Sequence, residues 1–239
     1  MKSVLEHIES KRVEFQAAAL FQQHLAQRQP DPVRALWFMK HAAHFVMAFS
    51  DLNKFCLREP SASDRWQDVV NEHTLEDDHH WPWYLDDLAT LGIDDVTSFA
   101  DALRFIWGDD NRATRVLSYR LWAMAEPADS LERLVIIEAI EATGEVFFSH
   151  LVDVAKQISS ERLERPLLYV ADHHFAVEQG HSAGRTDAEH GLENVRLTRA
   201  ARERYANIVD QVFVYFRDWV DELHRNAQAI TALELEVRV

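Results

Sequence analysis

The stretch LERLVIIEAIEATGEVFFSHL, residues 131–151, decides the fold class. Its apolar residues recur at the three- and four-residue spacing that keeps side chains on one face of an α-helix. The preceding EPADS supplies turn residues where the helix starts, which predicts one long helix over about 129–160. The apolar face of this helix is defined by Ile137, Ile140, Phe147, Phe148 and Leu151.

The composition of the whole chain supports the same interpretation. Its 239 residues include only six glycines and six prolines, so turn-forming residues are scarce. A β-sandwich or β-barrel needs many more of them. With 47% hydrophobic and 27% charged residues, the chain resembles an ordinary globular protein with a substantial core. We therefore expect an all-α protein with short connections.

Prolines, glycines and capping residues predict where the helices begin and end. Ser3 can cap the first helix, and Pro32 suits the first turn of the second. Pro82 should kink the third helix, which ends at Gly92. The predicted helices cover about 3–28, 31–58, 63–91, 95–107, 110–125, 129–160, 166–180 and 187–228.

These helices are expected to form one domain. No internal repeat, low-complexity segment or long linker divides the chain, which predicts a single bundle of seven to eight helices over residues 1–230. Residues 231–239 follow as a C-terminal extended tail, in which apolar and charged residues alternate with a period of two. The tail can form a short strand or an arm against a second subunit, or it can fray.

Charge and hydropathy exclude several classes of partner. The net charge of −15 disfavours nucleic acids and anionic membrane surfaces, which bind basic patches. No apolar run approaches the roughly 18 residues of a membrane helix. Acids near the N-terminus predict that the chain is not exported. A single cysteine, Cys56, fits a reducing compartment, so we expect a cytoplasmic protein with one buried thiol.

Three potential metal ligands share one helix face in the segment HFAVEQGH. If the segment is helical, His174, Glu178 and His181 stand at i, i+4 and i+7, within the apolar face of the helix that starts at Pro166. Burying a carboxylate and two imidazoles is costly without a partner. A metal ion satisfies all three groups together, whereas separate hydrogen bonds inside the core are the alternative.

The helix predicted over 63–91 offers a second set of ligands. His73, Asp77 and His80 lie within about 40° of its apolar direction, with Glu76 on the edge of that arc. Glu76 and His80 form the favoured inward pair at i, i+4. The pair Glu72 and His79 is an open alternative, and so is an acidic face in solvent.

The long helix over 129–160 adds a carboxylate. Among its three central acids Glu141 lies nearest to the apolar face, and Glu145 is the second choice. Carboxylates and imidazoles without thiolates suit iron or manganese better than structural zinc. Two such metals between the helices of a bundle are a usual device for activating dioxygen. The motifs of serine hydrolases, zinc proteases and phosphate loops are absent from the sequence.

Taken together, these motifs resemble the heme-oxygenase-like superfamily, and more closely its diiron oxidase branch, whose relatives include the TenA-type proteins. That branch carries a Glu and a His on an early helix, a Glu on a middle helix, and His-x3-Asp/Glu-x2-His on a later one. HFAVEQGH matches the last element, and IEATGE and EDDHHWPWYLDDL match the others in form. The resemblance covers nearly the whole chain and implies a labile pair of irons.

Other members of the same superfamily fit the sequence less well. A TenA-type hydrolase depends on a cysteine in the middle of the chain, whereas Cys56 lies early. A heme oxygenase needs a proximal histidine on the first helix, where His7 is the candidate. A ferritin-like diiron bundle needs an inward glutamate on the helix over 31–58, which has none. The aromatics of that helix are expected to line an apolar pocket, although ordinary core packing explains them equally well: Trp37, His41, His44, Phe45 and Phe49.

We therefore expect a non-heme iron oxidoreductase that activates dioxygen and oxidises a small organic substrate, with manganese as a possible substitute metal. By resemblance the chain forms a homodimer. The alternatives are a metal-free domain that binds a small molecule and a cofactor-independent TenA-like enzyme. The expected metal ligands are Glu76, His80, Glu141, His174, Glu178 and His181.

Overall fold

A computed structural model describes residues 1–26, 30–61, 64–93, 97–158, 162–163, 165–171 and 189–237, without the side chains of 189–190 and 233–237. Every regular element in this part of the chain is a helix, and eight of the helices have nine or more residues. The prediction of an all-α helical bundle is confirmed.

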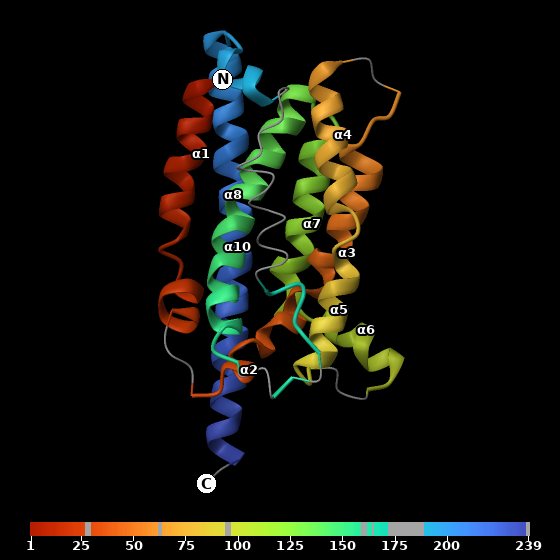
Figure 1. The fold of residues 1–239 in the computed structure, drawn as a ribbon, viewed down its shortest axis with the longest axis vertical. Helices are drawn as coiled ribbons and strands as arrows, with labels where there is room; N and C mark the ends of the chain where they lie inside the picture. Colours follow the sequence, from red (N-terminus) through yellow and green to blue (C-terminus); the bar gives the residue numbers. More distant parts are fainter. Residues whose placement is uncertain are drawn as a thin grey trace.

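Three helices, among them the two longest that the structure describes, form one side of the bundle. Their bounds are Lys2–Phe15 (α1), Ser130–Ala155 (α8) and Arg199–Val237 (α10). Helix α10 packs against both α8 and α1, and Figure 1 shows the three running almost parallel to the long axis. The start of α8 is fixed by a capping box, in which Asp129 and Glu132 bond each other's backbone N–H groups. The helix predicted over 129–160 is confirmed, with an end at Ala155.

Shorter helices form the other side of the bundle (Figure 1). Their bounds are Ala43–Leu52 (α3), Arg65–Asp77 (α4), Trp81–Thr90 (α5), Phe99–Trp107 (α6) and Arg112–Ala125 (α7). Helix α3 packs on α7, α4 packs on α8, and α7 packs on α10. The helices predicted over 95–107 and 110–125 correspond to α6 and α7.

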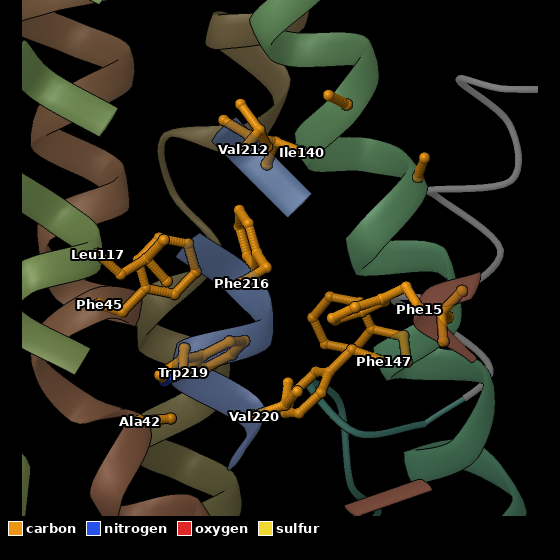
Figure 2. Packing of buried hydrophobic residues seen from close by; sticks show 14 of the residues in the cluster. Phe15, Ala42, Phe45, Leu117, Ile140, Phe147, Val212, Phe216, Trp219 and Val220 are labelled. Carbon is orange, nitrogen blue, oxygen red and sulfur yellow. The ribbon is translucent and has the colours of Figure 1, made fainter. Parts of the chain in front are cut away.

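Aromatic side chains fill the space between the two sides of the bundle. The ring of Trp219 lies between those of Phe45 and Phe147, with centroids 5.1 and 5.0 Å away, as Figure 2 shows. Phe15 packs edge-on against Phe213 at 6.0 Å. These contacts join α1, α3, α8 and α10 into one core.

The first predicted helix is divided into two. Met1, not Ser3, precedes α1, and its amino group donates to the carbonyl of Val195. Helix α1 ends at Phe15, and a π-helical turn follows at Leu20–Leu25 (η1). A break allows Phe15 and the adjacent pair Leu20 and Phe21 to be buried together, which a continuous α-helix does not permit.

The helix predicted over 31–58 has four parts. Pro32 occupies the first turn, as expected. The parts are α2 (Pro32–Ala35), the 3-10 helix η2 (Trp37–Ala42), α3, and the π-helix η3 (Asn53–Leu57). Side chains from elsewhere bond the carbonyls of η2. Tyr84 Oη donates to Met39 O at 2.8 Å, and Thr114 Oγ1 donates to His41 O at 2.9 Å.

The third predicted helix is broken rather than kinked. Helix α4 ends at Asp77, and α5 starts at Trp81 with Pro82 in its first turn. Because proline has no N–H to donate, it starts a helix more easily than it continues one. The helix ends as predicted at Gly92, whose φ of +66° suits glycine.

The later boundaries also differ from the prediction. Residues 165–171 form turns and bends, so no helix starts at Pro166. A 3-10 helix at Glu189–Asn194 (η6) precedes α10, which starts at Arg199 instead of about 187. Helix α10 continues to Val237, so the tail expected to be extended is helical up to that residue. None of the helices described is long and apolar enough to cross a membrane.

Candidate metal centre

Three predicted inward residues lie at the junction of α4 and α5. His73 and Asp77 are on the buried face of α4, and His80 is the residue immediately before α5. Their exposed fractions are 6%, 8% and 7%. The predicted inward arc of the early helix is therefore confirmed.

The acid that reaches the interior is Asp77, and its neighbour Glu76 is exposed on the outer side of α4. Glu72 and His79 are exposed as well. The predicted pair of Glu76 and His80 assumed one continuous helix, but the helix ends between them. Asp77 was predicted to lie on the inward arc, but it was not in the expected ligand set. Pro82, which starts a new helix, is the sequence signal that could have identified Asp77 as the inward acid.

Helix α8 contributes the carboxylate expected from it. Glu141 Oε1 lies 2.8 Å from Nδ1 of His73, and the two side chains are only 18% and 7% exposed. The second choice, Glu145, points elsewhere, with a carboxylate oxygen 3.8 Å from the guanidinium of Arg12 on α1. The structure thus brings Glu141 of α8 and His73 of α4 together.

These groups adjoin a cavity of about 70 Å³ in the bundle interior. Asp77, His80 and Glu141 supply its acidic and imidazole groups. The remaining wall is mostly aromatic and includes Phe45, Phe49, Phe147, Tyr169, Phe216 and Trp219. Phe45 and Phe49 belong to the segment predicted to line an apolar pocket.

A network of polar contacts holds the turn that carries His80. Arg58 Nη2 lies 2.6 Å from a carboxylate oxygen of Asp78, and Ser50 Oγ donates to Asp78 O at 2.6 Å. Burial raises the pKa of Asp78, but the hydrogen bond and charge of Arg58 outweigh it, so the pKa lies below its ordinary value. The ring of His80 stacks on Trp83 with centroids 4.7 Å apart. The turn and the imidazole are both held in place.

Asp87 of α5 holds the chain where it passes the cavity. Its buried carboxylate accepts hydrogen bonds from the backbone N–H groups of Leu168, Tyr169 and Val170 at 2.8, 2.8 and 2.9 Å. Burial raises the pKa of Asp87, while the three N–H donors act in the opposite direction. Because Tyr169 lines the cavity, this carboxylate fixes the chain at the cavity wall.

The other expected ligands, His174, Glu178 and His181, lie outside the described residues. Residues 1–171 and 189–237, where described, contain no group of three or more His, Cys, Asp or Glu positioned to hold a metal ion. Leu167 and Val170, predicted to face the core, are buried. The described donors nearest the cavity are therefore those of α4, α5 and α8.

The donor atoms suit a particular kind of metal. Carboxylate oxygens and imidazole nitrogens favour iron or manganese, and the one thiol of the chain takes no part. Cys56 is buried, its Sγ donates to Trp122 O at 3.7 Å, and burial raises its pKa. His7 contacts Asp210 instead, and its Nε2 lies 2.9 Å from Oδ1 of that residue. The described part of the centre is chemically compatible with non-heme iron.

Comparisons with known proteins assign no family to this chain. No protein-family model matches it, and a search of curated proteins returned no significant match.

Proposed function

We propose that the chain is a non-heme iron oxidoreductase of the heme-oxygenase-like type, which activates dioxygen and oxidises a small organic substrate. One observation carries the proposal. Asp77 at the end of α4, His80 in the turn before α5 and Glu141 of α8 line one aromatic cavity in the bundle interior. Polar groups that meet in an apolar cavity are expected to serve binding or catalysis.

In this proposal Asp77 replaces Glu76 in the ligand set. Asp77, His80 and Glu141 would hold one iron, and His174, Glu178 and His181 would hold the other. Manganese can substitute because it prefers the same nitrogen and oxygen donors. His73 positions Glu141 through the contact of its Nδ1 with Oε1.

The irons would supply the electrons that activate dioxygen. The surrounding side chains exclude water, bind the substrate and orient His80. The aromatic wall keeps water out and binds the apolar part of the substrate. The bond from Ser50 to the turn and the ion pair of Arg58 with Asp78 keep His80 oriented. Asp87 keeps Tyr169 against the cavity.

The decisive experiment is an anaerobic titration of the metal-free protein with ferrous iron, followed by exposure to dioxygen. We expect about two irons per chain and a transient absorption after oxygen is admitted. His174→Ala and His181→Ala should each lower iron uptake. Glu72→Gln, on the exposed side of α4, and His7→Ala, on α1 beside Asp210, serve as matched controls and should leave uptake unchanged. Undiminished uptake in both histidine variants would contradict the proposal.

A metal-free binding domain is the second candidate. It is favoured by the contact of His73 with Glu141, which brings an imidazole and a carboxylate within 2.8 Å of each other without a metal. Its test is a double-mutant cycle of His73→Ala and Glu141→Gln in unfolding experiments. A coupling energy that is the same with and without ferrous iron supports the binding domain. A coupling that changes when iron binds supports the oxidoreductase.

A further inference from the structure

A groove runs along the outer side of α3, opposite the inner cavity. Its volume is about 500 Å³, and α3, the start of α5 and the end of α6 form its walls. Met47, Ile106 and Trp107 give it an apolar lining, and Lys54 and Asp51 add one charge of each sign. This size falls in the range of about 300–1,000 Å³ that small-molecule sites occupy.

Only a thin wall separates the groove from the inner cavity. Two residues, Ser50 and Trp81, line both spaces. Ser50 is fixed, since its Oγ donates to Asp78 O at 2.6 Å and accepts from Lys54 Nζ at 3.0 Å. Trp81 is partly exposed and immediately follows His80. The side chain of Trp81 is therefore the larger part of the wall, and it packs against the core while remaining partly exposed.

The two spaces differ greatly in size. A cavity of about 150 Å³ holds a benzene molecule, whereas the inner cavity measures about 70 Å³. A substrate with an aromatic ring or a branched body does not fit inside it. The inner cavity accepts a narrow end only, and the groove on the other side of Trp81 has room for the body.

One polar group in the wall of the inner cavity indicates the chemistry of that narrow end. Trp219 is 3% exposed, lines the cavity, and has an indole N–H without a hydrogen-bond partner in the described part of the chain. Its ring lies among Phe45, Phe147 and Phe216, which offer no acceptor (Figure 2). A buried donor is costly to leave unpaired, so a bound molecule that brings an acceptor is favoured.

The outer wall of the groove suits an uncharged apolar body. Every residue of α6 is at least partly exposed, and Trp107, which is 56% exposed, contacts the ring of His44 edge-on at 5.7 Å. Burial lowers the pKa of His44, so this imidazole stays neutral near pH 7. The groove thus presents aromatic rings and a neutral imidazole beside one Lys and one Asp.

We propose that the groove binds the apolar body of the substrate and that Trp81 admits only a narrow end, bearing a hydrogen-bond acceptor for Trp219, into the inner cavity. The proposal rests on the proposed function for the identity of this molecule as the substrate. The binding itself depends on the groove, the wall and the indole, and it needs no iron. Trp81 is therefore a specificity-determining residue.

The test compares three probes with the same phenyl body, using calorimetry on the full chain with and without ferrous iron. Benzylacetone has a narrow methyl ketone end, its tert-butyl ketone analogue has a bulky end, and butylbenzene has no acceptor. We expect benzylacetone to bind at least about tenfold more tightly than the bulky analogue. Trp81→Ala should reduce this ratio to about threefold or less, because a smaller side chain opens the wall.

Two further variants complete the test. Trp219→Phe should abolish the preference for benzylacetone over butylbenzene while keeping the size selectivity. Trp122→Ala, on α7 outside both spaces, should change neither ratio. Trp81→Phe should give an intermediate ratio, and it replaces Trp81→Ala if circular dichroism shows that the alanine variant is unfolded.

The outcomes separate this proposal from the proposed function. Size selectivity that is absent in the natural sequence, or unchanged in a folded Trp81 variant, overturns the access route even if two irons bind. Equal affinity for benzylacetone and butylbenzene in the natural sequence overturns the role of Trp219. The expected ratios in a chain that takes up no iron confirm the binding site and reject the oxidoreductase.

Discussion

Two adjacent acids of α4 have opposite surroundings. Asp77 is 8% exposed at the inner cavity, while Glu76 lies on the outer surface. Helical periodicity alone places both near the same arc. Asp77 is the last residue of α4, and the chain then turns so that His80 approaches the cavity from the start of α5. Asp77 therefore faces the cavity with His80, whereas its neighbour Glu76 lies on the outer surface.

Asp77→Asn should weaken ferrous iron binding by about tenfold or more, because it removes a negative charge from the proposed ligand set. Glu76→Gln changes charge and size in the same way on the exposed side and should alter binding less than about twofold. Iron titration of both variants measures the difference. A stronger effect of Glu76→Gln would return Glu76 to the ligand set and remove Asp77 from it.

A second residue-scale prediction concerns Asp87, whose carboxylate accepts three backbone hydrogen bonds. Asp87→Asn keeps only one acceptor oxygen, so we expect a loss of about 2–4 kcal/mol in the free energy of unfolding. Hydrogen exchange at residues 168–170 should accelerate in parallel. Urea unfolding and exchange measurements check both effects.

Its neighbour Asp86 is the matched control for this prediction. Asp86 forms an ion pair with Arg165 at 3.1 Å, with both side chains about half exposed. Exposed pairs of this kind contribute about 1 kcal/mol or less. Equal destabilisation by Asp86→Asn and Asp87→Asn would show that the three backbone hydrogen bonds of Asp87 contribute no more to the free energy of unfolding than an exposed ion pair does.

At the scale of whole elements, the sequence predicted α8 better than it predicted the segment 31–58. Helix α8 has its own capping box and a continuous helical pattern, so local signals are sufficient. Within 31–58 the 3-10 helix η2 is bonded by Tyr84 and Thr114, which are distant in sequence. Local patterns contain no information about such partners.

The N-terminus of helix α7 is capped by a residue of another helix. Asn111 precedes α7, but its side chain is occupied by His41 and by the carbonyl of Phe105, at 2.7 Å each. The carboxylate of Glu222 on α10 instead accepts the N–H groups of Ala113 and Thr114 at 2.7 and 3.0 Å. This buried acid does the work of an N-cap across the bundle.

Glu222→Gln should therefore lower the free energy of unfolding by about 1–2 kcal/mol, because an amide has one acceptor oxygen and no charge. Asp218, on the same helix, pairs with Arg120 on the surface, and Asp218→Asn should cost less than about 1 kcal/mol. Urea unfolding of the two variants measures the difference. A cost for Asp218→Asn as large as that for Glu222→Gln would contradict the cross-bundle cap.

For the molecule as a whole, buried and partly buried histidines predict a loss of stability in acid. Burial lowers the pKa of His24, His41, His44, His150 and His224. In the unfolded chain they take up protons at their ordinary pKa of about 6.5, whereas the folded chain does so only at lower pH. Their contribution to stability is complete above about pH 6.5 and is lost as the pH falls.

We expect the urea midpoint to decrease between about pH 7.5 and about pH 5.5. Asp87 opposes this change, because burial raises its pKa and the folded chain then binds a proton more tightly than the unfolded one. A single carboxyl acts against five imidazoles, so the decrease should prevail. A midpoint that stays constant or rises over this interval would contradict the prediction.

The sequence by itself determined the all-α class, the long helix α8 and the inward direction of His73, Asp77 and Glu141. These properties depend on periodicity and capping within one segment, where neighbouring residues carry the information. It also predicted an apolar pocket lined by the aromatics of residues 31–58, of which Phe45 and Phe49 line the cavity and Trp37, His41 and His44 do not.

Only the tertiary structure decided where the helices break, which acid at the end of α4 faces the cavity, and how the cavity adjoins the outer groove through Trp81. These depend on contacts between distant segments, such as those of Arg58 with Asp78, Tyr84 with Met39 and Glu222 with α7. The free energy of such contacts exceeds the small local preferences of a helix, and it appears only when the bundle has formed.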